Sequence, residues 1–203
     1  MSQDYLNPDG DIRKHGDKLP HWQQGEVIQF VTIRLGDALP REKVLHWKSQ
    51  SEAWRNTWPP PWTPEQEAEY HKRFTAKLES WLDQGCGSCL LGDPAKRQIL
   101  QEVFMRFQGE RVNHHAWVIM PNHVHLLFQP VNPLGILLQA WKSVSAKLIG
   151  HGSIWQANYR DTLIRDGEHF ANAVRYIRRN PIKAKLRADS FTLWQSERAL
   201  LVP

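Results

Sequence analysis

The chain has 203 residues, of which 41% are hydrophobic and 23% charged, a composition that indicates a folded globular protein and excludes a disordered or collagen-like chain. Lysine and arginine total 26 against 21 acidic residues, and the resulting net charge of +5 only weakly favours a nucleic-acid partner. Two cysteines do not make a disulfide framework, and because no apolar run could cross a bilayer or serve as a signal core, we expect a cytoplasmic protein without a membrane partner.

The N-terminal half is predicted to contain one strand followed by helices. Its expected elements are a flexible arm over 1–25, a strand over 27–35, and helices over 40–54 and 64–84. Thr63, Pro64 and Gln66 form a capping-box pattern at the start of the second helix, after a proline-rich connector over 58–62. We therefore interpret residues 40–90 as a helical insertion after the first strand.

The C-terminal half is predicted to contain a β-hairpin between helices. Its expected elements are a helix over 94–108 capped by Asp93, strands over 111–120 and 123–129, a helix over 134–149, a short strand over 161–165 and a helix over 168–179. Pro121 and Asn122 suit the tight turn of the hairpin, and Pro181 is expected to end the last helix. This order predicts an α+β domain over 26–190, with an antiparallel sheet covered by helices on at least one face, and a C-terminal tail over 191–203.

Two histidines in the second hairpin strand are candidate metal ligands. Side chains alternate along a strand, so His123 and His125 share one face while the apolar residues between and after them face the core. Neutral imidazoles in this arrangement can bind one divalent ion, although such a pair can equally be structural. His114 and His115 are adjacent, point to opposite faces, and are interpreted as structural.

The last predicted helix carries Tyr176 and, four residues later, Asn180. Residues with this spacing face the same way on a helix. Pro181 disfavours helical dihedrals at Asn180, so the amide of Asn180 could complete a metal shell or cap the helix. The stretch from 175 to 187 has six basic residues and no acid, a cluster that can neutralise phosphates.

Cys86 and Cys89 form a CxxC pattern without a second cysteine pair. Zinc would need two further ligands, so the pattern is interpreted as structural or incidental.

Several short motifs, taken together and in this order, resemble the REP-associated tyrosine transposases, a branch of the single-tyrosine HUH transposases. The matching segments are 19–22 (LPHW), 30–35 (FVTIRL), 118–127 (VIMPNHVHLL), 141–143 (WKS), 155–156 (WQ), Tyr159 with Asp161, 164–165 (IR), 169–170 (HF) and 176–184 (YIRRNPIKA). The resemblance extends over residues 19–187, and the insertion at 40–90 departs from the compact core of the family.

The resemblance implies a ferredoxin-like α+β fold, with the two histidines on a central strand and Tyr176 on a facing helix. It implies Mg²⁺ or Mn²⁺ on His123 and His125, and single-stranded or hairpin-forming repeat DNA as the substrate. Related enzymes use a glutamine four residues after the tyrosine as a third ligand, and here that position is Asn180. Tyr176 would attack a DNA phosphate, form a 5′-phosphotyrosine link and free a 3′-OH, in a nicking and rejoining enzyme that is a monomer or a homodimer.

The cations expected to contact DNA phosphates are Lys142, Lys147, Arg165, Arg178 and Arg179. No side chain stands out as a general base. Three alternatives remain open: a non-cutting DNA- or RNA-binding module on the same fold, a metallohydrolase that uses water and leaves no covalent adduct, and a relative that initiates plasmid or phage replication.

Overall fold

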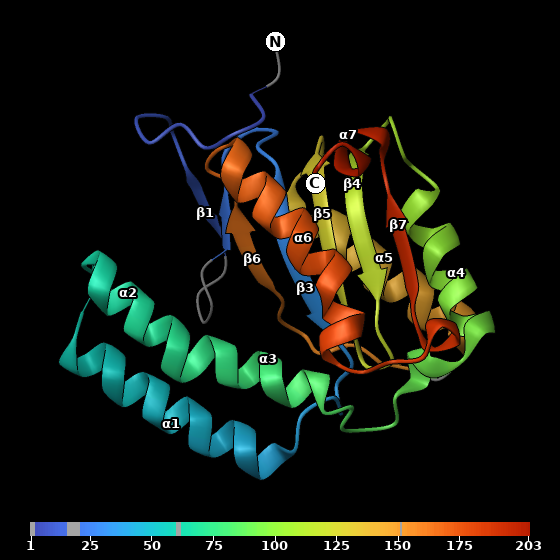
Figure 1. Ribbon diagram of the computed structural model, residues 1–203, viewed down its shortest axis with the longest axis horizontal. Coiled ribbons are helices and arrows are strands. Elements are labelled where there is room, and N and C mark those ends of the chain that lie inside the picture. Colours follow the sequence, from blue (N-terminus) through green and yellow to red (C-terminus); the bar gives the residue numbers. More distant parts are fainter. Residues whose placement is uncertain (1–2, 16–20, 60–61, 151) are drawn as a thin grey trace.

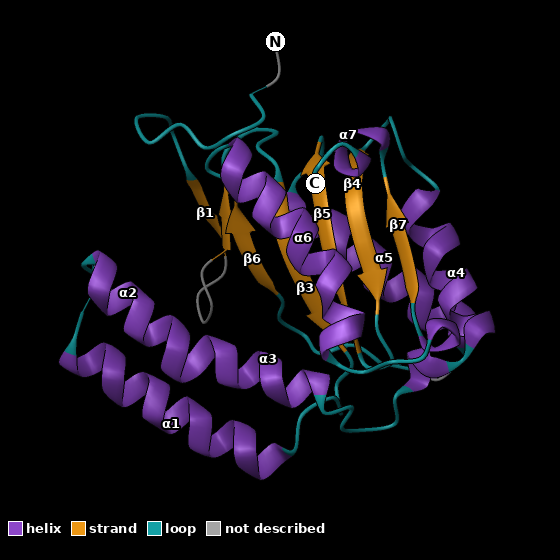
Figure 2. Cartoon of the chain, viewed as in Figure 1, coloured by secondary structure: helices purple, strands orange, loops and turns teal. Residues whose placement is uncertain are grey.

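An antiparallel sheet of five strands, with helices on both faces, carries the fold (Figure 1, Figure 2). The computed structural model describes residues 3–15, 21–59, 62–150 and 152–203. The sheet consists, in spatial order, of β6 (Arg160–Leu163), β3 (Gln29–Arg34), β5 (His123–Pro130), β4 (Val112–Ile119) and β7 (Thr192–Gln195). β5 is the central strand, and every residue in it is buried.

The connections between the strands follow the ferredoxin-like β-α-β-β-α-β order. Helix α4 (Pro94–Met105) leads from the insertion into β4, and helix α5 (Leu134–Ile149) connects β5 to β6. The strands β3, β4, β5 and β6 are first to fourth along the chain, and in the sheet they stand in the order fourth, first, third, second. The predicted α+β class with a ferredoxin-like sheet is therefore confirmed, and β7 is added at one edge.

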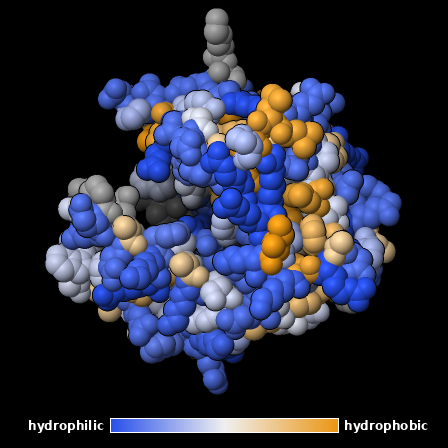
Figure 3. All heavy atoms as spheres, viewed as in Figure 1, coloured by the Kyte–Doolittle hydropathy of each residue, from blue (hydrophilic) through white to orange (hydrophobic). Residues whose placement is uncertain are grey.

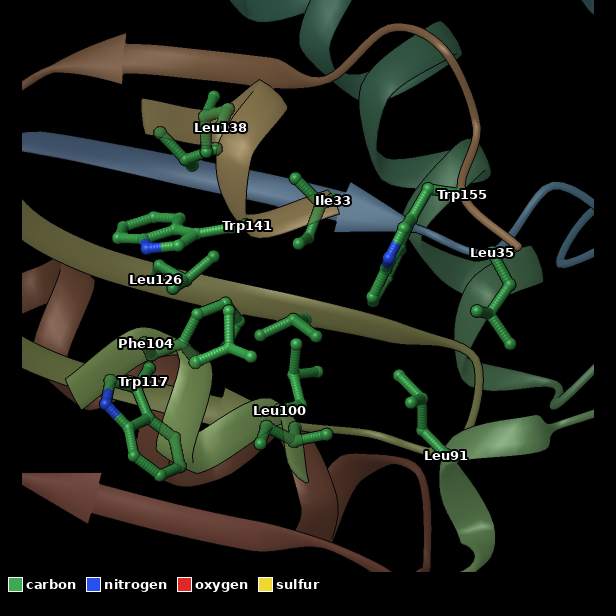
Figure 4. Packing of buried hydrophobic residues seen from close by; sticks show 14 of the residues in the cluster. Ile33, Leu35, Leu91, Leu100, Phe104, Trp117, Leu126, Leu138, Trp141 and Trp155 are labelled. Atoms are coloured by element: carbon green, nitrogen blue, oxygen red, sulfur yellow. The ribbon is translucent and has the colours of Figure 1, made fainter. Parts of the chain in front are cut away.

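The side chains of β5 alternate between two apolar cores. Leu126 and Phe128 face α4 and α5, where Trp141 has ring-centroid distances of 5.2 Å to Phe128 and 5.1 Å to Phe104 (Figure 4). Leu127 belongs to the second core, under helix α6 (Gly167–Lys183). The strand is buried on both faces, and the burial of each large apolar side chain stabilises the fold by about 2 kcal/mol. The side chains of β5 are therefore held in fixed positions.

The insertion forms two helical rods that lie side by side (Figure 1), and their surface is mostly hydrophilic on the face in view (Figure 3). One rod is α1 (Arg41–Thr57), and the other runs without a break through α2 (Pro64–Tyr70), a π-helical turn η1 (His71–Thr75) and α3 (Ala76–Asp83). Phe74 joins the rods, with ring centroids 6.4 Å from Trp47 and 6.1 Å from Trp54. The expected helical insertion is confirmed, and residues 60 and 61 of its proline-rich connector lie outside the described ranges.

The capping box predicted at the start of the second rod is present. The backbone N–H of Gln66 donates to Thr63 Oγ1 at 3.3 Å, and the backbone N–H of Thr63 donates to Gln66 Oε1 at 3.0 Å. After α3, the chain makes a short 3-10 turn η2 (Leu90–Gly92) and enters α4, whose N-cap Asp93 accepts from the backbone N–H of Ala95.

The expectation of a loose N-terminal arm is wrong for the residues that the structure describes there. Strands β1 (Arg13–His15) and β2 (His21–Gln23) form a two-stranded sheet. The backbone N–H of Leu6 donates to the carbonyl of Ile164 at 2.9 Å, and Tyr5 packs against the core under α6. Elements of three residues are too short for periodicity to reveal, and Leu19 and Pro20 of the first motif lie outside the described residues.

The expectation of a C-terminal tail is also wrong, because residues 192–195 form β7 and pair with β4. Trp194 stacks on Trp117, with ring centroids 5.9 Å apart. A 3-10 turn η3 (Ala188–Ser190) leads into β7, and helix α7 (Glu197–Leu200) follows it and buries Ala199. This segment therefore closes one edge of the sheet.

Helix α6 does not end before Pro181 as predicted, but continues to Lys183 with Pro181 inside it. Pro181 lacks an N–H, so the helix loses one internal hydrogen bond there. Hydrogen bonds resume beyond the proline, where the N–H of Ala184 donates to the carbonyl of Asn180 and that of Leu186 to the carbonyl of Pro181. Asn180 thus lies within the helix, one turn from Tyr176, and Ala184 is the C-cap residue. Within the described part of the chain, we find no helix with the length and apolar character of a membrane span.

Candidate active site

His123 and His125 face each other on one side of β5. Their Nε2 atoms are 3.1 Å apart, and their ring centroids are separated by 4.7 Å. The alternation of β5 places both rings on the side of the sheet that α6 covers, as expected from the sequence. Each residue is only 1% exposed. The pair is therefore enclosed by protein rather than open to solvent.

A hydrogen-bond chain fixes the orientation of the His123 ring. The Asn122 amide donates through Nδ2 to the carbonyls of Leu82, at 3.1 Å, and Cys86, at 3.2 Å. The Asn122 oxygen is therefore the atom that faces Nδ1 of His123, at 2.7 Å, and it can only accept. Nδ1 of His123 accordingly carries the proton, and the Nε2 lone pair points toward His125.

The ring of His125 is held by a threonine of the neighbouring strand. Thr32 lies opposite His125 in the β3–β5 register, and its hydroxyl is 2.8 Å from Nδ1 of His125. When Nδ1 donates to this hydroxyl, the Nε2 lone pair of His125 points toward Nε2 of His123. In this tautomer both Nε2 lone pairs are available to one cation, whereas with the Thr32 hydroxyl as the donor, Nε2–H of His125 donates to Nε2 of His123.

Burial keeps both imidazoles neutral. It lowers the pKa of His123 to about 3, with a smaller effect from the charge of Lys183. Burial also lowers the pKa of His125 well below its usual value, and the neighbouring His123, Arg160 and Lys183 lower it further. Neutral imidazole is the form that binds metal ions, so the rings are in their ligating form at neutral pH.

The donor atoms present fit a divalent metal ion. Two ligands at right angles and about 2.1 Å from an ion are about 3 Å from each other, close to the separation of the two Nε2 atoms. Asn180 is only 2% exposed, and its Oδ1 has no hydrogen-bond partner among the residues that the structure describes. The same residues contain no cluster of three or more His, Cys, Asp or Glu side chains arranged as a metal site. The two imidazoles are thus the donors that the structure brings together, and Asn180 adds a buried, unpartnered amide oxygen on the helix that carries Tyr176.

Tyr176 packs against the histidine pair from α6. Its ring centroid is 5.1 Å from that of His125 and 5.6 Å from that of Phe30, in edge-to-face contacts. Burial raises the pKa of the Tyr176 hydroxyl, and the charge of Glu79 raises it further, while a hydrogen bond with the Asn180 side chain acts in the opposite direction. The phenol is therefore protonated at neutral pH and lies beside the imidazoles.

Two of the cations that the sequence suggested for DNA contacts have internal partners. The Lys142 ammonium donates to the carbonyls of Gln156, Ala157 and Asn158 at 2.9, 3.0 and 3.4 Å, which uses all three of its donors. Arg178 donates to the carbonyls of Ala199 and Val202 and to the Gln195 side chain, and so ties α6 to the C-terminal segment. Lys147, Arg165 and Arg179 are exposed.

Two further cations border the site: Arg160, which sequence reasoning missed, and Lys183, which it included only in the basic cluster over 175–187. Arg160 lies opposite Thr32 in the β3–β6 register, and Thr32 lies opposite His125, so the three residues form a row across one face of the sheet. Lys183 is in the last turn of α6. Their positions depend on strand register and on the continuation of α6 past Pro181, and a single sequence shows neither.

Other residues of the sequence motifs also meet in space. Nδ1 of His21 lies 2.6 Å from Asp161 Oδ1, and the His21 ring stacks on Tyr159 with centroids 3.7 Å apart. The backbone N–H of Trp22 donates to the other carboxylate oxygen of Asp161 at 3.1 Å. These contacts fasten β2 to β6, which gives this group a structural role.

The remaining motif candidates are structural as well. His114 and His115 point to opposite faces as expected, His114 toward Trp141 and His115 toward Phe170. Cys86 and Cys89 are free thiols, and the carbonyl of Cys86 is one of the two acceptors that hold Asn122.

No family model matches the chain, and no curated protein matches it. Among solved structures, the chain is similar to one described as "Structure of the REP associates tyrosine transposase bound to a REP hairpin". The two are 16% identical, the match covers 83% of this chain and 74% of that chain, and the TM-score is 0.47. The chemistry of the site is therefore inferred from its own geometry and from the motifs of the sequence.

Proposed function

We propose that the protein is a metal-dependent endonuclease and strand transferase of the tyrosine transposase type, which acts on single-stranded DNA through a covalent link to Tyr176. One observation carries this proposal: the phenol ring of Tyr176 packs at 5.1 Å against one of two imidazoles whose Nε2 atoms face each other at 3.1 Å. A nucleophile beside a two-histidine donor pair is the arrangement that such chemistry requires.

His123 and His125 would hold Mg²⁺ or Mn²⁺, and the buried Oδ1 of Asn180 would be the third protein ligand. When bound, such an ion polarises a non-bridging phosphate oxygen and orients the scissile bond. Asn122 and Thr32 hold the two imidazoles in position through their Nδ1 atoms. Fixed orientation of ligands before binding lowers the cost of assembling the site.

Tyr176 would be the nucleophile. Its hydroxyl oxygen attacks the phosphorus, the bond from phosphorus to the 3′ oxygen breaks, the phenol loses its proton and the departing oxygen gains one. The products are a 5′-phosphotyrosine link and a free 3′-OH. The link keeps the energy of the phosphodiester, so reversal of the step with another 3′-OH rejoins the DNA at a new place.

The substrate class follows from the resemblance of the motifs and from the surface cations. Hairpin-forming repeat DNA is the substrate that the motifs imply, and a flexible single strand can place one phosphate at a confined site. The exposed Lys147, Arg165 and Arg179 are suited to contact phosphates farther along the strand.

A non-cutting nucleic-acid-binding module on the same fold is the second candidate. One observation favours it, namely that both imidazoles are 1% exposed and so closed to a phosphate in this conformation. The two candidates differ in whether a covalent adduct forms.

The deciding experiment uses the same hairpin-containing single strand labelled at either end, with Mn²⁺. A 3′-labelled strand should give a labelled protein band that survives denaturation, whereas a 5′-labelled strand should give a shorter free fragment ending in 3′-OH. Tyr176→Phe and chelation of the metal should abolish both products. Tyr159→Phe is the matched control and should retain them, and an adduct that persists in Tyr176→Phe would refute the assignment.

A further inference from the structure

The enclosure of the histidine pair raises the question of what a phosphate must displace to reach it. Tyr176 and Asn180 of α6 lie beside the pair, and the C-terminal half of α3 lies next to them. Figure 1 shows the end of α3 close to the end of α6. The insertion is therefore part of the wall around the site.

Two ion pairs join α3 to the rim of the site. Arg160 Nη1 lies 3.0 Å from Glu79 Oε1, and Lys183 Nζ lies 2.8 Å from Asp83 Oδ2. Glu79 and Asp83 are four residues apart and so share one face of α3. The two carboxylate side chains are only 20% and 13% exposed, whereas their cationic partners are 50% and 56% exposed. The acids thus point inward, and the cations remain open to solvent on their outer sides.

Both ion pairs act on the reactive groups through space. The charges of Arg160 and Lys183 lower the pKa of His125, and the charges of Glu79 and Asp83 raise that of Tyr176. The row Arg160, Thr32, His125 across the sheet places Arg160 on the same face as the histidines. Arg160 and Lys183 therefore border the histidine pair.

A carboxylate and a phosphodiester present the same kind of acceptor to a cation, namely negatively charged oxygens. Arginine binds either one through its planar fork, and the ammonium of lysine binds either one as a point charge. The cationic partners are about half exposed, so a phosphate can reach Arg160 and Lys183 from their solvent side.

We infer that Arg160 and Lys183 bind phosphates of the DNA strand that enters the site, and that Glu79 and Asp83 of α3 occupy these two cations until DNA replaces them. The insertion then acts as an anionic cover, because its two carboxylates occupy the positions that DNA phosphates would take. This inference rests on the proposed function, because it takes single-stranded DNA as the ligand. It gives the insertion a role that the compact core of the fold does not require.

The test measures binding alone, with the full chain carrying Tyr176→Phe, a labelled hairpin-containing single strand, and EDTA to remove metal. In this background, Glu79→Gln combined with Asp83→Asn should tighten binding roughly threefold to tenfold, because phosphate no longer competes with carboxylate. Glu52→Gln combined with Glu69→Gln removes two charges from the same insertion away from α3 and should change the affinity less than twofold.

Removal of the cations should have the opposite effect. Arg160→Gln or Lys183→Gln should weaken binding roughly fivefold to twentyfold and lower the slope of log Kd against log salt by about 0.7 for each phosphate that is no longer neutralised. Glu79→Gln should have no effect once Arg160→Gln is present, since the cation that it would release is already gone. All four positions are partly exposed, so thermal melts should show folded variants.

The inference is overturned if the Glu79 and Asp83 double variant binds no more tightly than its charge-matched control, or if neither cation variant weakens binding. If the wild type forms the tyrosine adduct but the Glu79 and Asp83 double variant binds DNA like its charge-matched control, the anionic cover is refuted and the proposed function stands. A protein that binds no single-stranded DNA at all would refute both.

Discussion

Asn122 and His123 are neighbours in the sequence, and their side chains are joined by a hydrogen bond of 2.7 Å between Oδ1 and Nδ1. Asn122 is itself held by the carbonyls of Leu82 and Cys86, at the exit of the insertion. The ring of a proposed metal ligand is therefore positioned by a segment about forty residues away in sequence, through one buried amide.

Asn122→Ala should weaken Mn²⁺ binding roughly 10-fold to 100-fold, because the tautomer and orientation of His123 are no longer fixed. It should also lower the free energy of unfolding by about 1–3 kcal/mol, since two buried carbonyls lose their donor. Titration of the DNA-free protein with Mn²⁺, followed by electron paramagnetic resonance, measures the first effect. Asn172→Ala on the outer side of α6 is the control, and equal Mn²⁺ affinity in the two variants would contradict the positioning role.

His114 should make stability depend on pH in the mildly acidic range. Burial lowers its pKa from 6.5 to about 4 in the folded protein. Between these values the unfolded chain binds a proton that the folded protein does not, so stability is lost as the pH falls from 6.5 toward 4. This single group accounts for about 3 kcal/mol over that window.

Urea denaturation at pH 7.5, 6 and 5 measures this effect. His114→Phe keeps an aromatic ring beside Trp141 but removes the titrating group, so its stability should fall less steeply with decreasing pH than that of the wild type. The variant should start from a lower stability at pH 7.5, because the Phe104 carbonyl loses its hydrogen-bond partner Nε2. Parallel curves would show that His114 is not the source.

Arg178 and Arg179 are adjacent, and their substitutions should have different consequences. Arg178→Gln should lower the free energy of unfolding by about 1–3 kcal/mol, because the carbonyls of Ala199 and Val202 lose their donor. Arg179→Gln should leave stability within about 0.5 kcal/mol of the wild type. In DNA binding, the slope of log Kd against log salt should be lower by about 0.7 in the Arg179 variant than in the wild type. The reverse pattern would mean that the two roles are exchanged.

Arg97→Lys should destabilise the protein even though it conserves the charge. Arg97 is 4% exposed, and its guanidinium donates to the carbonyls of Leu91 and Gly92 and to the Thr192 hydroxyl. Lysine cannot reproduce this planar set of donors, so we expect a loss of roughly 2–4 kcal/mol. Chemical denaturation checks this, with Lys96→Arg, whose ammonium is half-buried and pairs with the exposed Asp93, as the near-neutral comparison.

The features that the sequence predicted well depend on local patterns. Alternation along 123–129 placed the two histidines on one face, and the order of strands and helices indicated the α+β class. Pro121 and Asn122 marked the hairpin turn, although the second function of Asn122, as the partner of His123, follows only from contacts with Leu82 and Cys86. The roles proposed for the histidines and Tyr176 stay predictions until metal binding and the adduct are measured.

The features that the sequence did not predict depend on contacts between distant segments. Lys142 donates to three backbone carbonyls, and no pattern of side chains reveals such acceptors. Pro181 suggested the end of α6, but packing of the helix against the sheet outweighs the conformational preference of the residue before a proline. Residues 192–195 are too few for a reliable strand pattern, yet they gain a full set of partners along the edge of β4.

The π-helical turn at 71–75 determines in which direction the side chains of α3 point around the axis of the rod. Successive residues of an α-helix are about 100° apart around the axis, so a turn with one residue more or fewer rotates the downstream side chains by that amount. Deleting a single residue there would turn Glu79 and Asp83 away from their cations while leaving the length and composition of the insertion nearly unchanged. Insertions and deletions at that turn, rather than changes of charge, would be the simplest way for evolution to separate the rod from Arg160 and Lys183.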